Sequence, residues 1–138
     1  MKKLVYLGGK NTGLKCLKML LQEAGEYGWE VIQVIGTPGP RGDYLLHALQ
    51  GKNIPFTSRL EELKQCDLLL SVQYGMILSA EDISKAGVAL NLHMAPLPEY
   101  RGCNQFSHAI MDGAKQFGTT IHQLVPEIDK GPIFFQKR

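Results

Sequence analysis

The chain has 138 residues, 44% of them hydrophobic, which is enough for one domain with one sizeable core. Its 15 basic and 13 acidic residues are intermixed and leave a formal net charge of +2, so bulk nucleic-acid binding is not indicated. The three cysteines are an odd number without CxxC spacing, which indicates neither a disulfide framework nor a zinc site and favours a reducing cytoplasm.

The first predicted strand, residues 4–7, is a short apolar run that ends at Gly8-Gly9. It is too short for a signal peptide or a membrane span, so no membrane segment is expected. Leucines at helical spacing then predict a helix over residues 14–21. The glycine turn matches neither the Walker nor the dinucleotide-binding pattern. A tight packing turn is therefore the favoured interpretation, and a phosphate contact through Lys10 is the alternative.

Residues 30–36 are rich in β-branched side chains and predict a second buried strand. The proline- and glycine-rich residues 37–40 predict a loop, and residues 43–50 a helix. Residues 54–56 are too short and too interrupted by proline to assign. The continuous apolar run at 67–72 predicts a strand that is buried on both faces.

Ser79 is suited to cap a helix and is followed by acidic residues, so it predicts another helix start. A strand at 87–92, a helix at 104–113, a strand at 118–125 and a last strand from Ile133 follow. The alternation predicts an α/β fold, a Rossmann-like, mostly parallel sheet with helices on both faces. We expect one catalytic domain over the whole chain, truncated at its C-terminus because the last apolar strand has an uncovered edge.

Asn91 and His93 form the first candidate site, at the carboxyl end of the strand predicted at 87–92. Ligands of open parallel sheets bind beyond the carboxyl ends of the strands. Two residues one position apart on an extended backbone point to the same side, so an amide and an imidazole could converge on one reacting atom. They could stabilise an oxyanion and transfer a proton. On spacing alone, a histidine satisfied by local hydrogen bonds is an equal alternative.

The segment 125–132 predicts a strand exit into a loop that could bring Asp129 to His93. Its alternative role is that of a simple turn. The remaining histidines fit structural roles better, and no histidine set has metal-ligand spacing, so no metal site is expected. These histidines are His47, His108 and His122.

Three linked motifs resemble the folate-dependent formyltransferase family. They are an Asn-x-His pair at 91–93, a Leu-Pro-x-x-Arg-Gly loop at 97–102 and an Asp-x-Gly segment at 129–131. The resemblance implies an enzyme with 10-formyltetrahydrofolate as its formyl donor substrate and a primary amine as its acceptor. The family includes enzymes that act on glycinamide ribonucleotide, on methionyl-tRNA and on amino sugars.

The resemblance also implies the roles of individual residues. Asn91, His93 and Asp129 would be the catalytic trio, with the carboxylate raising the pKa of the histidine by its negative charge. The residues implied in donor binding are Gln73, Tyr74, Gly75, Met76, Ile77 and Leu78, together with Val125, Glu127 and Ile128. The candidates for acceptor binding are Lys10, Pro96, Arg101, Gly102 and Asn104.

The turn at 9–17 and the loop at 96–104 look most similar to members that act on nucleotide-linked amino sugars, and we expect such an acceptor. Gln105 stands where methionyl-tRNA members usually carry proline, and no basic cluster is present to hold a transfer RNA. Other interpretations stay open: a methionyl-tRNA or glycinamide ribonucleotide formyltransferase, a formyltetrahydrofolate hydrolase, or a non-catalytic paralogue that binds folate or a partner. A homo-oligomer also stays open.

Overall fold

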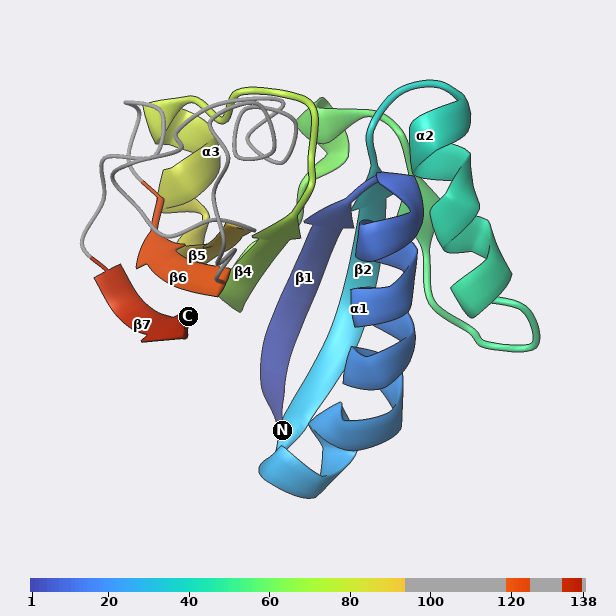
Figure 1. Cartoon of the computed structure of the whole chain (residues 1–138), viewed down its shortest axis with the longest axis horizontal. Helices are drawn as coiled ribbons and strands as arrows, with labels where there is room; N and C mark the ends of the chain where they lie inside the picture. Colours follow the sequence, from blue (N-terminus) through green and yellow to red (C-terminus); the bar gives the residue numbers. More distant parts are fainter. Residues whose placement is uncertain (94–118, 125–132, 138) are drawn as a thin grey trace, which may run out of the picture.

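The computed structural model describes residues 1–93, 119–124 and 133–137 of the chain. They form a sheet with helices packed against it (Figure 1). The strands are β1 (Lys2–Gly8), β2 (Trp29–Gly36), β3 (Phe56–Thr57), β4 (Cys66–Val72), β5 (Ala86–His93), β6 (Thr119–Gln123) and β7 (Ile133–Lys137). The α-helices are α1 (Lys10–Glu23), α2 (Pro40–Asp43) and α3 (Ala80–Ser84), and the 3-10 helices are η1 (Ala24–Tyr27), η2 (Tyr44–Ala48) and η3 (Leu60–Glu62).

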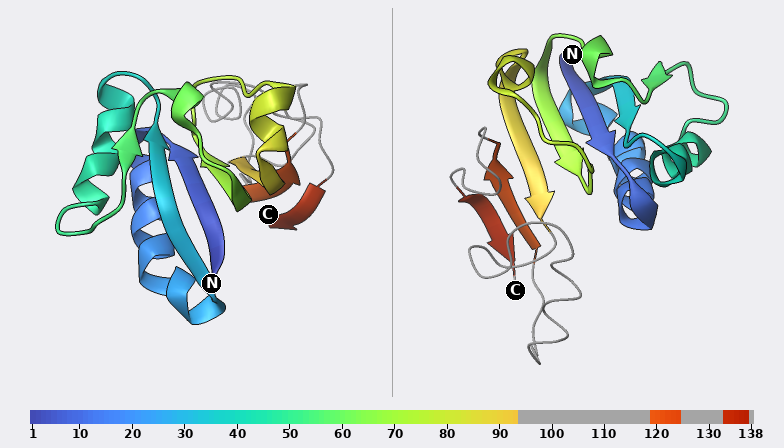
Figure 2. Two further views of the ribbon diagram at one scale, coloured as in Figure 1. Left: turned by 180° about the vertical axis from the view of Figure 1, so that it is seen from behind. Right: turned by 90° about the horizontal axis from the view of Figure 1, so that it is seen from above.

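The strand order within the described residues is β3-β2-β1-β4-β5-β6-β7. The pairs from β3 to β5 are parallel, whereas β6 pairs antiparallel with β5 and β7 pairs antiparallel with β6. In the right-hand view of Figure 2 the arrowheads of β1, β4 and β5 point the same way. The predicted mostly parallel, Rossmann-like sheet is therefore confirmed.

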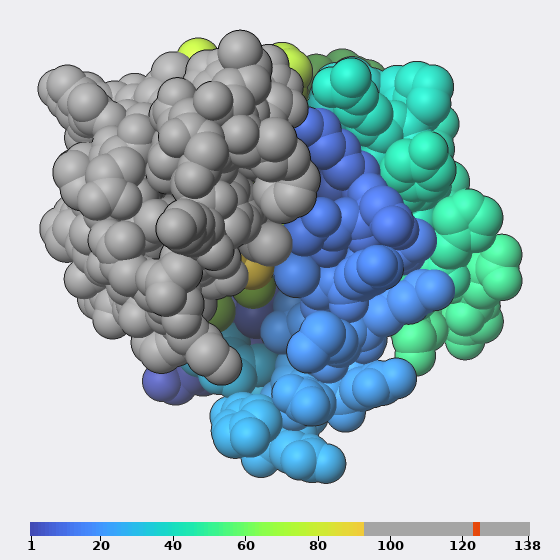
Figure 3. All heavy atoms as spheres, in the orientation of Figure 1, coloured from blue at the N-terminus to red at the C-terminus, as the bar shows by residue number. Residues whose placement is uncertain are grey.

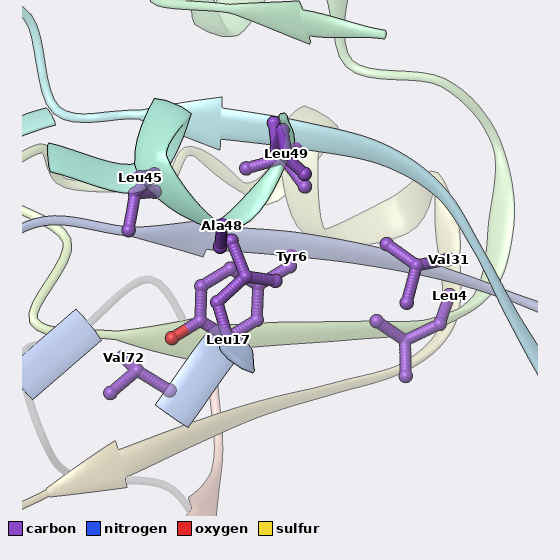
Figure 4. Packing of buried hydrophobic residues seen from close by; sticks show 9 residues of the cluster. Leu4, Tyr6, Leu17, Val31, Leu45, Ala48, Leu49 and Val72 are labelled. Carbon is purple, nitrogen blue, oxygen red and sulfur yellow. The ribbon is translucent and has the colours of Figure 1, made fainter. Parts of the chain in front are cut away.

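Alternate residues of β1 enter two hydrophobic clusters, one on each face of the sheet. Tyr6 packs in the cluster that contains Leu17 of α1 and Leu45 of η2 (Figure 4). Leu7 packs in the other cluster, together with Leu78 just before α3. Figure 3 shows α1 beside the α2 and η2 segment on the first face. Helical segments thus cover both faces, as the sequence predicts, because a strand alternates its side chains between the faces.

Helix boundaries differ from the sequence predictions. The predicted helix at 43–50 is wrong in extent and type: the helical segment begins at Pro40 as a short α-helix and continues as η2 to Ala48. Gly39 has a φ of 96°, a conformation that glycine adopts at little cost, and proline suits the first turn of a helix. Helix α1 also begins earlier than predicted, at Lys10.

The predicted cap at Ser79 is confirmed. Its hydroxyl accepts a hydrogen bond from the backbone N–H of Asp82 at 3.1 Å, and the Asp82 carboxylate accepts one from the Ser79 N–H at 3.0 Å. The helix predicted at 104–113 lies outside the described residues. Among the residues that are described, no helix is long and apolar enough to cross a membrane.

Leu17 joins α1 to the sheet and is fully buried. We expect Leu17→Ala to lower the free energy of unfolding by about 2–5 kcal/mol, because it removes buried methyl groups and leaves a cavity. Met19→Ala on the same helix, where the side chain is 62% exposed, should change it by less than about 0.5 kcal/mol. Urea unfolding of both variants measures the difference, and equal losses would contradict the assigned packing.

Candidate functional site

Parallel register brings the carboxyl ends of four strands to one edge of the sheet. Gly8 at the end of β1 lies opposite Gly36 of β2 and Val72 of β4, and Val72 lies opposite Leu92 of β5. The chain builds outward from β1 to β2 and β3, and then returns to place β4 on the other side of β1. Such a reversal of strand order is a topological switch point, where open α/β sheets bind their ligands.

Two residues with unusual backbone conformations lie at this switch point. Lys10 (φ 60°) and Gln73 (φ 58°) are the non-glycine residues with positive φ in the described part of the chain. Lys10 begins α1 just after β1, and Gln73 directly follows β4. Left-handed conformations are unfavourable for residues with a Cβ and cluster at ligand sites. The unusual backbone conformations and the sheet topology therefore indicate the same candidate ligand site.

The glycine turn after β1 packs too closely for side chains. A Cβ on Gly8 would lie 2.9 Å from the carbonyl oxygen of Val72. A Cβ on Gly9 would lie 2.7 Å from Thr37 Oγ1 and 3.1 Å from the carbonyl oxygen of Gln73. These contacts favour the interpretation as a tight packing turn. A phosphate contact through the half-buried Lys10 stays a prediction.

Thr37 is a residue of this edge to which the sequence predictions gave no role beyond a loop. Its backbone N–H donates to the carbonyl of Gly8 at 2.9 Å, and its hydroxyl accepts from the backbone N–H of Gly75 at 3.0 Å. The available signal was its position as the first residue after a predicted strand. Parallel strands put such residues side by side.

The segment after β4, residues 73–78, exposes both backbone and apolar side chains. Gly75 is exposed, Met76 is 48% exposed and Ile77 is 69% exposed, whereas Leu78 is buried in the core. Exposed apolar groups beside unshielded backbone are suited to a flat ligand that is apolar on its faces and polar at its edge. Both features lie next to the switch point.

Tyr74 in this segment carries a buried hydroxyl. Its oxygen has no hydrogen-bond partner among the described residues. Desolvation raises the pKa of Tyr74 to about 12, and the negative charges of Asp82 and Glu61 add to the effect. The phenol is therefore held in its neutral form.

Asn91 and His93 lie at the carboxyl end of β5. Asn91 is half-buried and lies opposite the buried Ser71 of β4 and opposite His122 of β6. The backbone of His93, the last residue of β5, lies opposite Thr120. The strand and its carboxyl end are thus as predicted. That the two side chains converge stays a prediction.

Other predicted site residues lie outside the described residues, so their grouping with His93 also stays a prediction. They are Pro96, Arg101, Gly102, Asn104, Val125, Glu127, Ile128 and Asp129. Within residues 1–93, 119–124 and 133–137, no group of three histidine, cysteine or acidic residues could hold a metal ion. Burial raises the pKa of the Cys16 and Cys66 thiols, so neither is an activated nucleophile.

The pKa of Tyr74 gives a test of its burial. Because that pKa lies above its ordinary value of 10, the neutral phenol stabilises the fold below pH 10, and this stabilisation is lost as the pH rises towards about 12. We expect Tyr74→Phe, which cannot ionise, to lose less stability than the wild type over this range. Urea unfolding at about pH 9 and about pH 11.5 measures it. Tyr27→Phe, at a tyrosine that is 74% exposed, is the matched control. Identical pH profiles for Tyr74→Phe and the wild type would contradict the assignment.

Comparison with known proteins gives consistent matches. The family described as formyl transferase matches residues 43–138, more than half of the chain. The methionyl-tRNA formyltransferase of Lactobacillus johnsonii is 30% identical over 156 residues, which cover 99% of this chain and 48% of that relative. The chain thus spans about half the length of the curated relatives that it matches over its whole extent.

Solved structures share the fold. Phosphoribosylglycinamide formyltransferase from Bacillus halodurans superposes with a TM-score of 0.81 at 22% identity, covering 99% of this chain and 78% of that chain. The N-formyltransferase from Helicobacter canadensis, in complex with folinic acid and dTDP-3-aminofucose, superposes with a TM-score of 0.76 at 26% identity. That match covers 99% of this chain and 52% of the Helicobacter chain.

Proposed function

This chain belongs to the formyl transferase family, and from that membership we propose that it transfers a formyl group from 10-formyltetrahydrofolate to a primary amine. The observation that carries the proposal is the family match over residues 43–138. This range includes both the segment after β4 and the carboxyl end of β5. The sequence motifs that resemble the family lie in the same range.

The donor substrate would bind along residues 73–78. Met76 and Ile77 offer exposed apolar surface to a pterin ring, and the carbonyl of the exposed Gly75 would accept a hydrogen bond from its edge. These features fit a flat heterocycle. Val125, Glu127 and Ile128 would complete the donor site.

The reaction joins the nitrogen of the acceptor amine to the formyl carbon and breaks the bond from that carbon to N10 of the folate. Negative charge develops on the formyl oxygen, and the Asn91 amide would donate a hydrogen bond to it. His93 would take the proton from the attacking amine and deliver it to N10. Asp129 would favour the protonated imidazole by its negative charge.

A nucleotide-linked amino sugar is the proposed acceptor. The residues proposed to bind it are Lys10, Pro96, Arg101, Gly102 and Asn104. The Helicobacter canadensis relative, which contains dTDP-3-aminofucose, supports this choice. The near-neutral charge balance also favours a small acceptor over a transfer RNA. Methionyl-tRNA is the second candidate because curated relatives carry that activity in their names.

We expect His93→Asn to lower the rate of formyl transfer by at least about 10²-fold without unfolding the protein, because it removes the group that moves the proton. The matched control is His47→Asn, the same substitution at an exposed residue of η2. It should leave the rate unchanged. Spectrophotometric tetrahydrofolate production measures both variants. Near-normal turnover of His93→Asn would remove this histidine from the mechanism.

The acceptor is identified by supplying 10-formyltetrahydrofolate with a panel of nucleotide-linked amino sugars, glycinamide ribonucleotide or methionyl-tRNA. We expect tetrahydrofolate to form fastest with one of the amino sugars. Methionyl-tRNA as the best acceptor would establish the second candidate. Release of formate at the same rate with no acceptor present would instead identify a hydrolase.

A further inference from the structure

Two chain segments meet at the side chain of Thr37, the first residue after β2. The first is the turn at Gly8-Gly9, between β1 and α1. The second is the segment after β4, which contains Gly75. Hydrogen bonds from Thr37 reach both of them, although the contacts join residues 29 and 38 positions apart in the chain. Thr37 therefore links the turn after β1 to the segment after β4 at the switch point.

The Thr37 hydroxyl both donates and accepts a hydrogen bond. It donates to the carbonyl oxygen of Gly8 at 3.3 Å, and it accepts from the backbone N–H of Gly75 at 3.0 Å. A hydroxyl is the smallest group that can donate and accept at once. The backbone N–H of Thr37 also donates to the Gly8 carbonyl, at 2.9 Å, which fixes the residue from which the hydroxyl projects.

The methyl group of Thr37 adds a steric contact. A Cβ built on Gly75 would lie 2.9 Å from Thr37 Cγ2, closer than real Cβ atoms approach other atoms. The Gly75 backbone thus lies directly against the threonine: its N–H donates to the hydroxyl, and the methyl group leaves no room for a Cβ on residue 75. The same side chain lies against Gly9, where a Cβ would meet Oγ1 at 2.7 Å.

We infer that Thr37 is a positioning residue for the donor site. It fixes residues 73–78 relative to the turn before α1, so that the segment is ordered before the donor binds. The inference rests on the proposed function, which assigns donor binding to this segment. Because Lys10 follows the same turn, Thr37 also sets the spacing between the donor segment and a candidate acceptor residue.

The physical reason is the cost of ordering a segment. Gly75 is exposed, and the adjacent backbone holds Gln73 at a φ of 58°. A segment without a fixed partner samples several conformations, of which only some can bind the ligand. The apparent affinity falls in proportion to the fraction of molecules in the binding-competent conformation. The bond to Thr37 raises that fraction, which strengthens binding without any contact between Thr37 and the ligand.

The test is equilibrium binding of 5-formyltetrahydrofolate, an unreactive relative of the donor, to the wild type and two variants. Thr37→Val keeps the shape and removes the hydroxyl, and we expect it to weaken binding about 5–10-fold, the range for one lost hydrogen bond. Thr37→Ser keeps the hydroxyl and should bind within about 2-fold of the wild type. In turnover, Thr37→Val should raise the KM for the donor more than it lowers kcat. Circular dichroism and thermal unfolding check that both variants fold.

A second pair of variants tests the contact without removing the hydroxyl. Gly75→Ala should weaken folate binding because its Cβ meets Thr37 Cγ2. Thr37→Ser removes Cγ2 and leaves Oγ1, at 3.6 Å from that Cβ, as the nearest atom of residue 37. The double variant Gly75→Ala/Thr37→Ser should therefore bind folate more tightly than Gly75→Ala alone, which a merely structural role of Thr37 does not predict. This comparison remains decisive if Thr37→Val fails to fold.

The outcomes separate this inference from the proposed function. If the wild type binds folate and Thr37→Val binds it equally well, the inference is overturned and the proposed function stands. If Gly75→Ala binds no better in the presence of Thr37→Ser, the inference is overturned in the same way. A wild type that neither binds 5-formyltetrahydrofolate nor uses the donor overturns the proposed function, and the inference with it.

Discussion

The parallel pairing of β1 with both β2 and β4 is the constraint on which the rest of the structure depends. Val5, Tyr6 and Leu7 are fully buried, and their alternation supplies both hydrophobic clusters. Parallel neighbours need crossover connections, so the segments between the strands must cross the faces of the sheet and cover them. The same pairing puts the carboxyl ends of the strands at one edge, where Gln73 and Asn91 lie.

This edge is built largely from backbone. Close packing excludes side chains at Gly8 and Gly9, and the buried Tyr6 hydroxyl donates to the carbonyl of Gly13 at 2.6 Å, which ties α1 to β1. Lys10 and Gln73 take left-handed conformations that cost about 1–2 kcal/mol each and persist because their surroundings fix them. If this edge binds the donor as proposed, such fixed backbone reduces the ordering cost of binding.

Family membership does not by itself determine the acceptor. Relatives that share the fold carry different acceptors in their names, since a fold does not determine function. The proposed donor segment and the proposed catalytic Asn91 belong to the strand ends that all these proteins share in fold. Most of the proposed acceptor residues, including Arg101 and Asn104, lie outside the described residues. Loops vary where the scaffold does not, so one sheet can serve several amines.

The sequence by itself determined the order of strands and helices, the parallel sheet and the position of Asn91 and His93 at a strand end, because apolar periodicity and turn residues are local signals. It also predicted the Ser79 cap. Only the tertiary structure decided the helix start at Pro40, the strained backbone at Gln73 and the link through Thr37. The link through Thr37 depends on contacts between segments about 30–40 positions apart, which no local pattern records.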